Sequence, residues 1–372
     1  MSDPSSYNLP QHWGGRLLVD ACIFQDYAGG IARAWTEILL EWASRGAVSR
    51  IFIVDRARTA PRFAGYIYID VPRYEYANDA AEQLRLGAIC GQVGANAFTS
   101  TYFSIAAGIP NLLLVHDMIP ERAVFDLSLP MWQQKRRAIE AAVGFAVVSL
   151  NSARDFAAYY PDAARRPTIL APNGVARRFS PPTQEEASAF RRGFCAKALG
   201  GRPHVMFINR GIGIKNGALL KEALTIWPNR IHHSLLVTTQ PNQADEWYPL
   251  LPDMPFNASY FFDEGLRLAY GTAHCLVYPS IYEGFGLPIL EAMACGCPVI
   301  CSNSSSLPEV AGDAALFIDP RDAQALVRAL DEVGRPDTRA LLIGRGLTRA
   351  REFGWARSVL ALETLLQRIA PV

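Results

Sequence analysis

The sequence has almost no net charge. Its 36 Lys and Arg residues balance 35 Asp and Glu residues, which leaves a formal net charge of +1. The balance also holds within each half, with 18 basic and 18 acidic residues through position 186 and 18 against 17 after it. Because a nucleic-acid interface needs a concentrated basic face, we do not expect nucleic acid as a partner.

Signals for crossing or leaving a membrane are also missing. The sequence contains no run of about 18 apolar residues, the length that a transmembrane helix requires. Its first segment, "MSDPSSYNLPQHWGG", has neither the basic nor the apolar region of a secretory signal. These absences predict a cytoplasmic protein.

Cysteine is present but forms no recognisable framework. The seven cysteines are an odd number and are scattered along the chain. Cys295 and Cys297 form a C-x-C pair, but no second Cys or His pair with metal-ligand spacing follows. We therefore expect small buried thiols in a reducing compartment, and no metal site.

Short apolar runs alternate with helical patterns almost throughout the 372 residues. Alternation of this kind, with continuously apolar strands, predicts parallel sheets covered by helices on both faces. The strand-like runs of the first half are 16–21, 50–55, 66–71, 111–117, 145–150 and 168–172. Those of the second half are 204–209, 233–239, 274–280, 298–303 and 315–319, with helices at about 216–227, 287–295 and 322–333.

The alternation breaks at "FSPPTQEEASAFRRG", residues 179–193, which is typical of a linker because it combines two prolines with polar residues. The sequence thus predicts two doubly wound α/β domains of similar size. Their proposed bounds are 1–186 and 187–350, with a C-terminal helix at 351–372 packing back toward the first domain. Ligands of open parallel sheets bind beyond the carboxyl ends of the strands, so residues that follow strands are the candidates for chemistry.

Two candidates lie in the first half. Gly29 and Gly30 follow the first strand in "QDYAGGIARA", where a helix start offers free N–H groups to an anion or an acceptor sugar. The plainer interpretation is a tight turn. His116 ends the strand in "VHDMIPE", and it is either a structural hydrogen-bonding residue or a functional one.

A third candidate is the turn in "FINRGIGIKNG", which carries Arg210 and Lys215 between a strand and a helix. Its glycines are spaced one residue too far apart for a dinucleotide fingerprint, and no Ser or Thr follows Lys215 as a phosphate-binding P-loop requires. Two cations at a helix start would bind a diphosphate. Two solvated charges are the alternative.

The fourth candidate is "YEGFGLPILEA", residues 282–292, with two glutamates and no basic residue beside them in the sequence. Glu283 lies in a loop, and Pro288 fits the first turn of a helix that carries Glu291. Carboxylates accept hydrogen bonds from hydroxyl groups and repel phosphate. One glutamate for each set of hydroxyls of a nucleotide sugar, with the diphosphate between them, would satisfy every charge.

These motifs together resemble the retaining GT-B glycosyltransferases of family 4, the glycosyl transferases group 1. The resemblance covers roughly residues 16–360 and is most specific in "PSIYEGFGLPILEAMACGCPVICSNSSSLPEVAGDAALFID", residues 279–319. The Gly-Gly turn, "VHD", "VVSLNSARDF", "PNGV" and the Arg-Lys turn match in the same order. The block from 282 to 319 is most similar to bacterial polysaccharide and O-antigen mannosyltransferases. The implied fold is two Rossmann-like domains facing across a cleft.

The resemblance implies a role for each candidate residue. Glu283 would bind hydroxyls of the donor sugar, and Glu291 the ribose. Arg210 and Lys215 would neutralise the diphosphate, and His116 would lie near the reaction centre. The donor loop would comprise Gly284, Phe285, Gly286 and Leu287, and the acceptor side Gly29 and Gly30. One departure is Asn209, at a position where the family commonly has Gly.

The implied reaction is metal-independent transfer of a hexose from a nucleoside-diphosphate sugar, without a cofactor, to a glycan or lipid-linked acceptor in polysaccharide or lipopolysaccharide biosynthesis. GDP-mannose is the expected donor, and a UDP-, dTDP- or GDP-fucose-type donor would also fit. Three different functions compete with this one: a nucleotide-sugar 2-epimerase, an NAD-dependent dehydrogenase, and a catalytically silent nucleotide-sugar-binding scaffold. The dehydrogenase lacks its glycine fingerprint.

A helix at residues 131–142 suggests one more partner. Trp132 lies close to Lys135, Arg136 and Arg137, a combination found where helices contact anionic membrane surfaces. Peripheral contact with the inner face of the cell membrane would fit a lipid-linked acceptor. An ordinary solvated helix face is the alternative.

Overall fold

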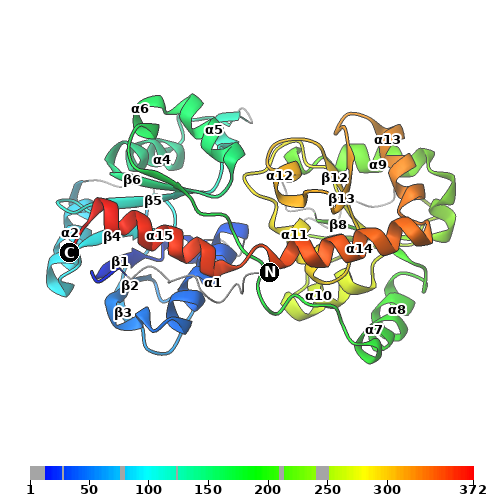
Figure 1. The fold of residues 1–372 in the computed structure, drawn as a ribbon, viewed down its shortest axis with the longest axis horizontal. Coiled ribbons are helices and arrows are strands. Elements are labelled where there is room, and N and C mark those ends of the chain that lie inside the picture. Colours follow the sequence, from blue (N-terminus) through cyan, green and yellow to red (C-terminus); the bar gives the residue numbers. More distant parts are fainter. Residues whose placement is uncertain (1–12, 27–28, 76–79, 123–124, 209–212, 240–250) are drawn as a thin grey trace, which may run out of the picture.

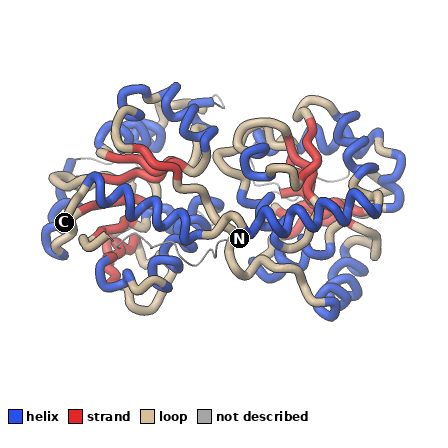
Figure 2. The backbone as a smooth tube through the Cα atoms, viewed as in Figure 1, coloured by secondary structure: helices blue, strands red, loops and turns tan. Residues whose placement is uncertain are grey.

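The computed structural model describes residues 13–26, 29–75, 80–122, 125–208, 213–239 and 251–372. The chain forms two lobes side by side, one from each half of the sequence except for the last helix, which lies on the first lobe (Figure 1). Each lobe has a central sheet with helices packed on its faces (Figure 2). Within the described residues, no helix is both long and apolar enough to cross a membrane.

The first lobe is built on a seven-stranded sheet in the order β3-β2-β1-β4-β5-β6-β7, with every neighbouring pair parallel. Its strands are β1 Leu17–Asp20, β2 Ile51–Arg56, β3 Ile67–Val71, β4 Ala97–Ser100, β5 Asn111–Val115, β6 Gly144–Val147 and β7 Thr168–Leu170. Its helices are α1 Gly30–Ser44, α2 Ala80–Val93, α3 Ile119–Arg122, α4 Pro130–Ala141, α5 Leu150–Tyr159 and α6 Pro161–Ala164. The apolar runs of β1, β2 and β5 are buried strands, as predicted, because helices cover both faces, whereas the outer strands β3 and β7 are only partly buried.

The second lobe has a six-stranded parallel sheet in the order β10-β9-β8-β11-β12-β13. Its strands are β8 His204–Ile208, β9 Ser234–Thr238, β10 Phe256–Ser259, β11 Cys275–Tyr278, β12 Val299–Ser302 and β13 Ala315–Ile318. Its helices are α9 Gly217–Ile226, α10 Asp263–Thr272, α11 Leu287–Ala294, α12 Leu307–Ala311, α13 Ala323–Glu332 and α14 Pro336–Arg351. Both sheets reverse their strand order beside the first strand, which is the doubly wound arrangement predicted from the sequence.

The segment predicted as a linker, 179–193, contains a helix. Helix α7 Gln184–Phe190 begins with a capping box, in which the Thr183 hydroxyl accepts from the Glu186 N–H and the Glu186 carboxylate accepts from the Thr183 N–H. The T-x-x-E spacing is the sequence signal for this helix, and the linker prediction overlooked it. A π turn, Arg191–Cys195, continues into α8 Ala196–Ala198.

The last helix, α15 Trp355–Ile369, lies along the first lobe although α14, which precedes it, packs on the second (Figure 1). It contacts α1, β6 and β7. A Cβ atom built on Gly144 of β6 would lie 2.8 Å from Ile369 Cγ2, so the helix sits directly against the sheet. The domain bounds at 186 and 350 stay a prediction. All seven cysteines are free and buried, as expected from the sequence.

Candidate active site

Glu283 and Lys215 meet at the carboxyl ends of two neighbouring strands of the second sheet. Glu283 follows β11, and Lys215 ends a 3-10 turn, Gly213–Lys215, that follows β8. The Lys215 Nζ lies 2.5 Å from Glu283 Oε1 and 3.0 Å from the Tyr278 hydroxyl. Glu283 is only 7% exposed, so its charge needs a close counter-ion. Lys215 therefore fixes the position of the carboxylate.

Gly284 brings this loop into contact with the other lobe. A Cβ atom at Gly284 would lie 1.9 Å from the carbonyl oxygen of His116, so a side chain does not fit there. The hydroxyls of Ser149 and Ser152, at the start of α5, both donate to the Gly284 carbonyl, at 2.7 and 3.0 Å. The loop after β11 is thus attached to the carboxyl ends of β5 and β6.

Serines of the second lobe hold the same loop from its other side. The Ser305 hydroxyl accepts from the Glu283 N–H at 3.0 Å, and the Ser306 hydroxyl donates to the carbonyls of Glu283 and Phe285. Gly286 then caps α11 with a φ of 104°, a left-handed conformation that glycine adopts without strain. These contacts direct the first N–H groups of α11, from Leu287 onward, toward the end of the sheet.

Glu291 lies in the second turn of α11, as predicted, and is 4% exposed. Its partner comes from the other lobe: the Arg33 guanidinium of α1 forms an ion pair with Glu291 and donates to Asp263 at 2.7 Å. The Tyr270 hydroxyl also lies 3.4 Å from the Glu291 carboxylate. The two glutamates therefore do have basic partners, but these lie far away in the sequence.

His116 directly follows β5, and its carbonyl oxygen faces Gly284 of the loop that carries Glu283. Burial, and then the positive charge of Lys135, lower the pKa of His116 to about 3, so the imidazole is neutral at physiological pH. Its Nε2 has no hydrogen-bond partner among the described residues. Burial raises the pKa of the neighbouring Asp117, which accepts from the Ile119 N–H at 2.9 Å.

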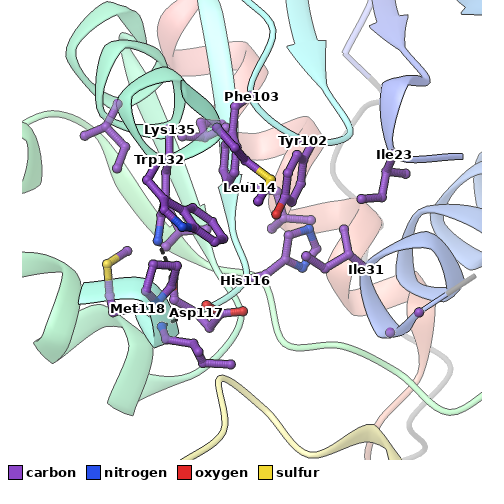
Figure 3. A pocket seen from close by; sticks show the side chains of 18 of the residues that line it. Ile23, Ile31, Tyr102, Phe103, Leu114, His116, Asp117, Met118, Trp132 and Lys135 are labelled. Carbon is purple, nitrogen blue, oxygen red and sulfur yellow. Dashed lines mark hydrogen bonds between the residues drawn. The ribbon is translucent and has the colours of Figure 1, made fainter. Parts of the chain in front are cut away.

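Gly29 and Gly30 begin α1 and border a cavity of about 340 Å³ in the first lobe (Figure 3). A Cβ atom built on either glycine meets no described atom within 4 Å, so neither is required for close packing within the described chain. His116 lines the same cavity. The structure thus brings these three predicted residues to one side of the Glu283 loop.

Some predicted features are placed differently or lie outside the described residues. Arg210 and Asn209 are outside them, so the phosphate-binding turn is described only from Gly213 onward. In α4, Lys135 is 5% exposed and pairs with Glu121 at 2.8 Å, so it presents no charge to a surface. Trp132 lines the cavity. Peripheral contact with a membrane stays a prediction.

Ser149, Ser152 and Arg33 were not predicted from the sequence. The two serines belong to "SLNS", directly after a predicted strand, which was a usable signal of the same kind as the others. Arg33 gave no local signal, because its partners are more than 200 residues away in the chain. Among the described residues, no group of three or more His, Cys, Asp or Glu side chains could hold a metal ion. Independence from metal stays a prediction.

Comparison with known proteins finds a family match for the part of the chain that contains residues 279–319. Residues 260–340 match the family described as Glycosyl transferases group 1. A stretch of 97 residues is 52% identical to O-antigen chain mannosyltransferase B of Escherichia coli, over 26% of this chain and 26% of that protein. The matched stretches span between 14% and 31% of the length of the mannosyltransferases that the chain resembles.

Solved structures match over nearly the whole chain. Sucrose-phosphate synthase from Thermosynechococcus elongatus has a TM-score of 0.74 at 18% identity, with 95% of this chain and 98% of that chain covered. Anabaena HepE in complex with UDP and glucose has a TM-score of 0.72 at 16% identity, with coverage of 94% and 99%. At these identities, the comparison shows the shared fold alone.

Proposed function

We propose that the chain is a retaining hexosyltransferase that uses a nucleoside-diphosphate sugar, because it carries a glycosyl transferases group 1 domain and folds as two GT-B lobes. The observation that carries the proposal is the cluster of Lys215, Glu283 and the α11 start at the carboxyl end of the second sheet. Cation, carboxylate and helix N–H groups are the three kinds of group that such a donor requires.

The proposed chemistry follows from the leaving group. The bond between the sugar and the β-phosphate breaks toward an oxocarbenium-like state, and negative charge grows on the phosphate. Lys215, together with Arg210 and the N–H groups that begin α11, would stabilise that charge. Glu283 would accept hydrogen bonds from the donor sugar, and Glu291 from the ribose. The acceptor would attack the face from which the phosphate leaves, and the phosphate would take its proton.

We propose GDP-mannose as the donor, because several similar curated proteins are named mannosyltransferases. A UDP-sugar is the second candidate, since HepE, which shares the fold, was solved with UDP and glucose. A dTDP-sugar and a GDP-fucose-type donor are further alternatives for the donor. A catalytically silent nucleotide-sugar-binding scaffold is the alternative function. The acceptor would be a glycan or a lipid-linked glycan, used in the cytoplasm or at the inner face of the membrane.

Turnover of the donor tests this proposal. The full chain is incubated with GDP-mannose or UDP-glucose in the presence of EDTA, and the sugar released is followed by ¹H NMR. We expect one donor to give its nucleoside diphosphate and, first, the α-anomer of the sugar, by slow transfer to water. A β-anomer formed first would contradict retention, and a requirement for added divalent metal would contradict metal independence. Absence of turnover with every nucleotide sugar would favour the scaffold.

A further inference from the structure

The cavity beside His116 has a lining that differs from that of a sugar site. It lies between the start of α1, the loop after β4, the end of β5 and helix α4 (Figure 3). Its volume of about 340 Å³ is at the lower end of the range for small-molecule sites, about 300–1,000 Å³. Apart from His116, Asp117 and Lys135, the described residues that line it are apolar, aromatic or glycine.

Aromatic rings form one wall of the cavity. Trp132 of α4 packs edge-on against Phe125, with 5.7 Å between ring centroids. The rings of Tyr102 and Phe103, in the loop after β4, have centroids 3.9 Å apart. Ile31 of α1 faces His116 from the opposite side (Figure 3). The cavity is therefore a preformed apolar pocket whose lining includes His116, which adjoins the loop that carries Glu283.

The charged groups of the lining are already engaged. The Lys135 ammonium pairs with Glu121 and donates to the Asp117 carbonyl, and the Asp117 carboxylate accepts from a backbone N–H. Two buried polar atoms, Nε2 of His116 and Nε1 of Trp132, have no hydrogen-bond partner among the described residues. The cavity thus offers an occupant few hydrogen bonds.

The small number of hydrogen-bonding groups in the cavity favours one of two kinds of occupant. A hexose buried here would leave most of its hydroxyl groups without partners, and each unsatisfied buried polar group is costly. A hydrocarbon group has no such cost and gains from leaving water. We propose that the cavity binds an apolar aglycone, an aryl or alkyl group attached to the acceptor, with the acceptor's hydroxyl directed toward the Glu283 loop. That the bound group belongs to an acceptor rests on the proposed transferase function. The preference for an apolar group rests on the lining of the cavity alone.

Binding to the full chain tests the proposal without requiring turnover. Calorimetry compares phenyl α-D-mannopyranoside and octyl α-D-mannopyranoside, the latter below its micelle concentration, with methyl α-D-mannopyranoside. We expect the phenyl or the octyl compound to bind about tenfold or more tightly than the methyl compound, because burying a ring or chain of this size supports at least that factor. Preference for one of the two distinguishes an aryl from an alkyl aglycone.

Filling the cavity locates the binding site. Ile31→Trp and Ile119→Trp, from different walls, are each expected to abolish the preference, while Ile226→Trp, at a position 41% exposed in the second lobe, keeps it. Equal affinities for all three glycosides in the parent chain would overturn the proposal, whether or not the variants fold. So would an undiminished preference in a folded filling variant.

Nucleoside-diphosphate binding, measured on the same samples, separates this proposal from the proposed function. If GDP or UDP binds but the glycosides bind equally, the apolar pocket is wrong and the transferase stands. If the phenyl or octyl compound is preferred but no nucleotide binds, the pocket stands and the transferase is wrong.

Discussion

At the scale of single residues, the site depends on ionisable groups whose environments the sequence could not reveal. Glu283 is buried against Lys215, and Glu291 is buried against Arg33. The charge of each buried carboxylate is balanced by one cation, which is distant in the sequence but in contact with it in the fold. A carboxylate held in this way is oriented before any ligand arrives, which suits recognition of sugar hydroxyls.

Replacing Lys215 tests the role of the cation. Lys215→Met is expected to lower kcat by about 10²-fold or more, by analogy with the loss of one donor that stabilises developing negative charge. The measurement is initial rate at saturating donor. Lys197→Met, at an exposed position, serves as the control and is expected to leave kcat unchanged. A kcat near that of the parent chain in Lys215→Met would contradict the assignment.

The neutral state of His116 has a measurable consequence for stability. Its pKa of about 3 in the fold lies below the value of about 6.5 in an unfolded chain. As the pH falls from about 6.5 toward 3, the unfolded chain binds a proton that the folded chain does not. Protonation of His116 in the unfolded chain therefore lowers the free energy of unfolding as the pH decreases across that window.

The variant His116→Asn is accordingly expected to flatten the dependence of the free energy of unfolding on pH below about 6.5, by up to about 1.4 kcal/mol per pH unit. Urea unfolding at pH 7 and pH 4.5 measures it. The other charged groups beside this ring, Lys135 and Asp117, are the same in both proteins. Identical slopes in variant and parent would show that the imidazole is not held neutral.

At the scale of elements, the loop between β11 and α11 is the joint between the lobes. Gly284→Ala would place a methyl group 1.9 Å from the His116 carbonyl oxygen. We expect this overpacking to cost about 1–3 kcal/mol and to displace Glu283, lowering both the melting temperature and kcat. In Gly344→Ala on α14, the added methyl group meets no described atom within 4 Å, so the control is expected to be neutral or slightly stabilising. Equal effects of the two variants would contradict the close contact.

Most elements are predictable from the sequence because their apolar runs are continuous and bounded by polar turns. Strands β4 "AFTS" and β10 "FNAS" were missed, since four residues with polar members give no clear pattern. Helix α7 lies in a segment predicted as a linker, because the two prolines outweighed its capping box. The candidate residues that follow strands were chosen by that rule, and their roles stay predictions. The contacts between the lobes were not, because they join residues more than 130 positions apart.

At the scale of the whole molecule, two features connect the lobes. Helix α15 returns to the first lobe after α14 has packed on the second (Figure 1). Ion pairs add to this, because Arg33 of the first lobe contacts Glu291 and Asp263 of the second, and Arg178 contacts both Glu37 and Asp263. The residue proposed to bind ribose is thereby linked to the helix that begins at the acceptor side.

Removing Arg33 tests this connection. Arg33→Gln leaves Glu291 buried without its cation, which is expected to cost about 3 kcal/mol and to lower the melting temperature measured by calorimetry. Arg136→Gln breaks an ion pair whose side chains are 65% and 59% exposed, and is expected to leave the melting temperature nearly unchanged. If both variants melt at the same temperature, the pair between the lobes does not contribute to stability.

The most direct test of the central claim is ligand-dependent thermal unfolding of the full chain with GDP, UDP, ADP, dTDP and NAD in turn, without metal. A ligand at about 100 times its Kd adds about 2.7 kcal/mol, a shift of a few degrees for a protein of this size. We predict a shift with one nucleoside diphosphate, GDP first, that is lost in Glu291→Gln. A shift with NAD alone, or with none of the five, would contradict the account.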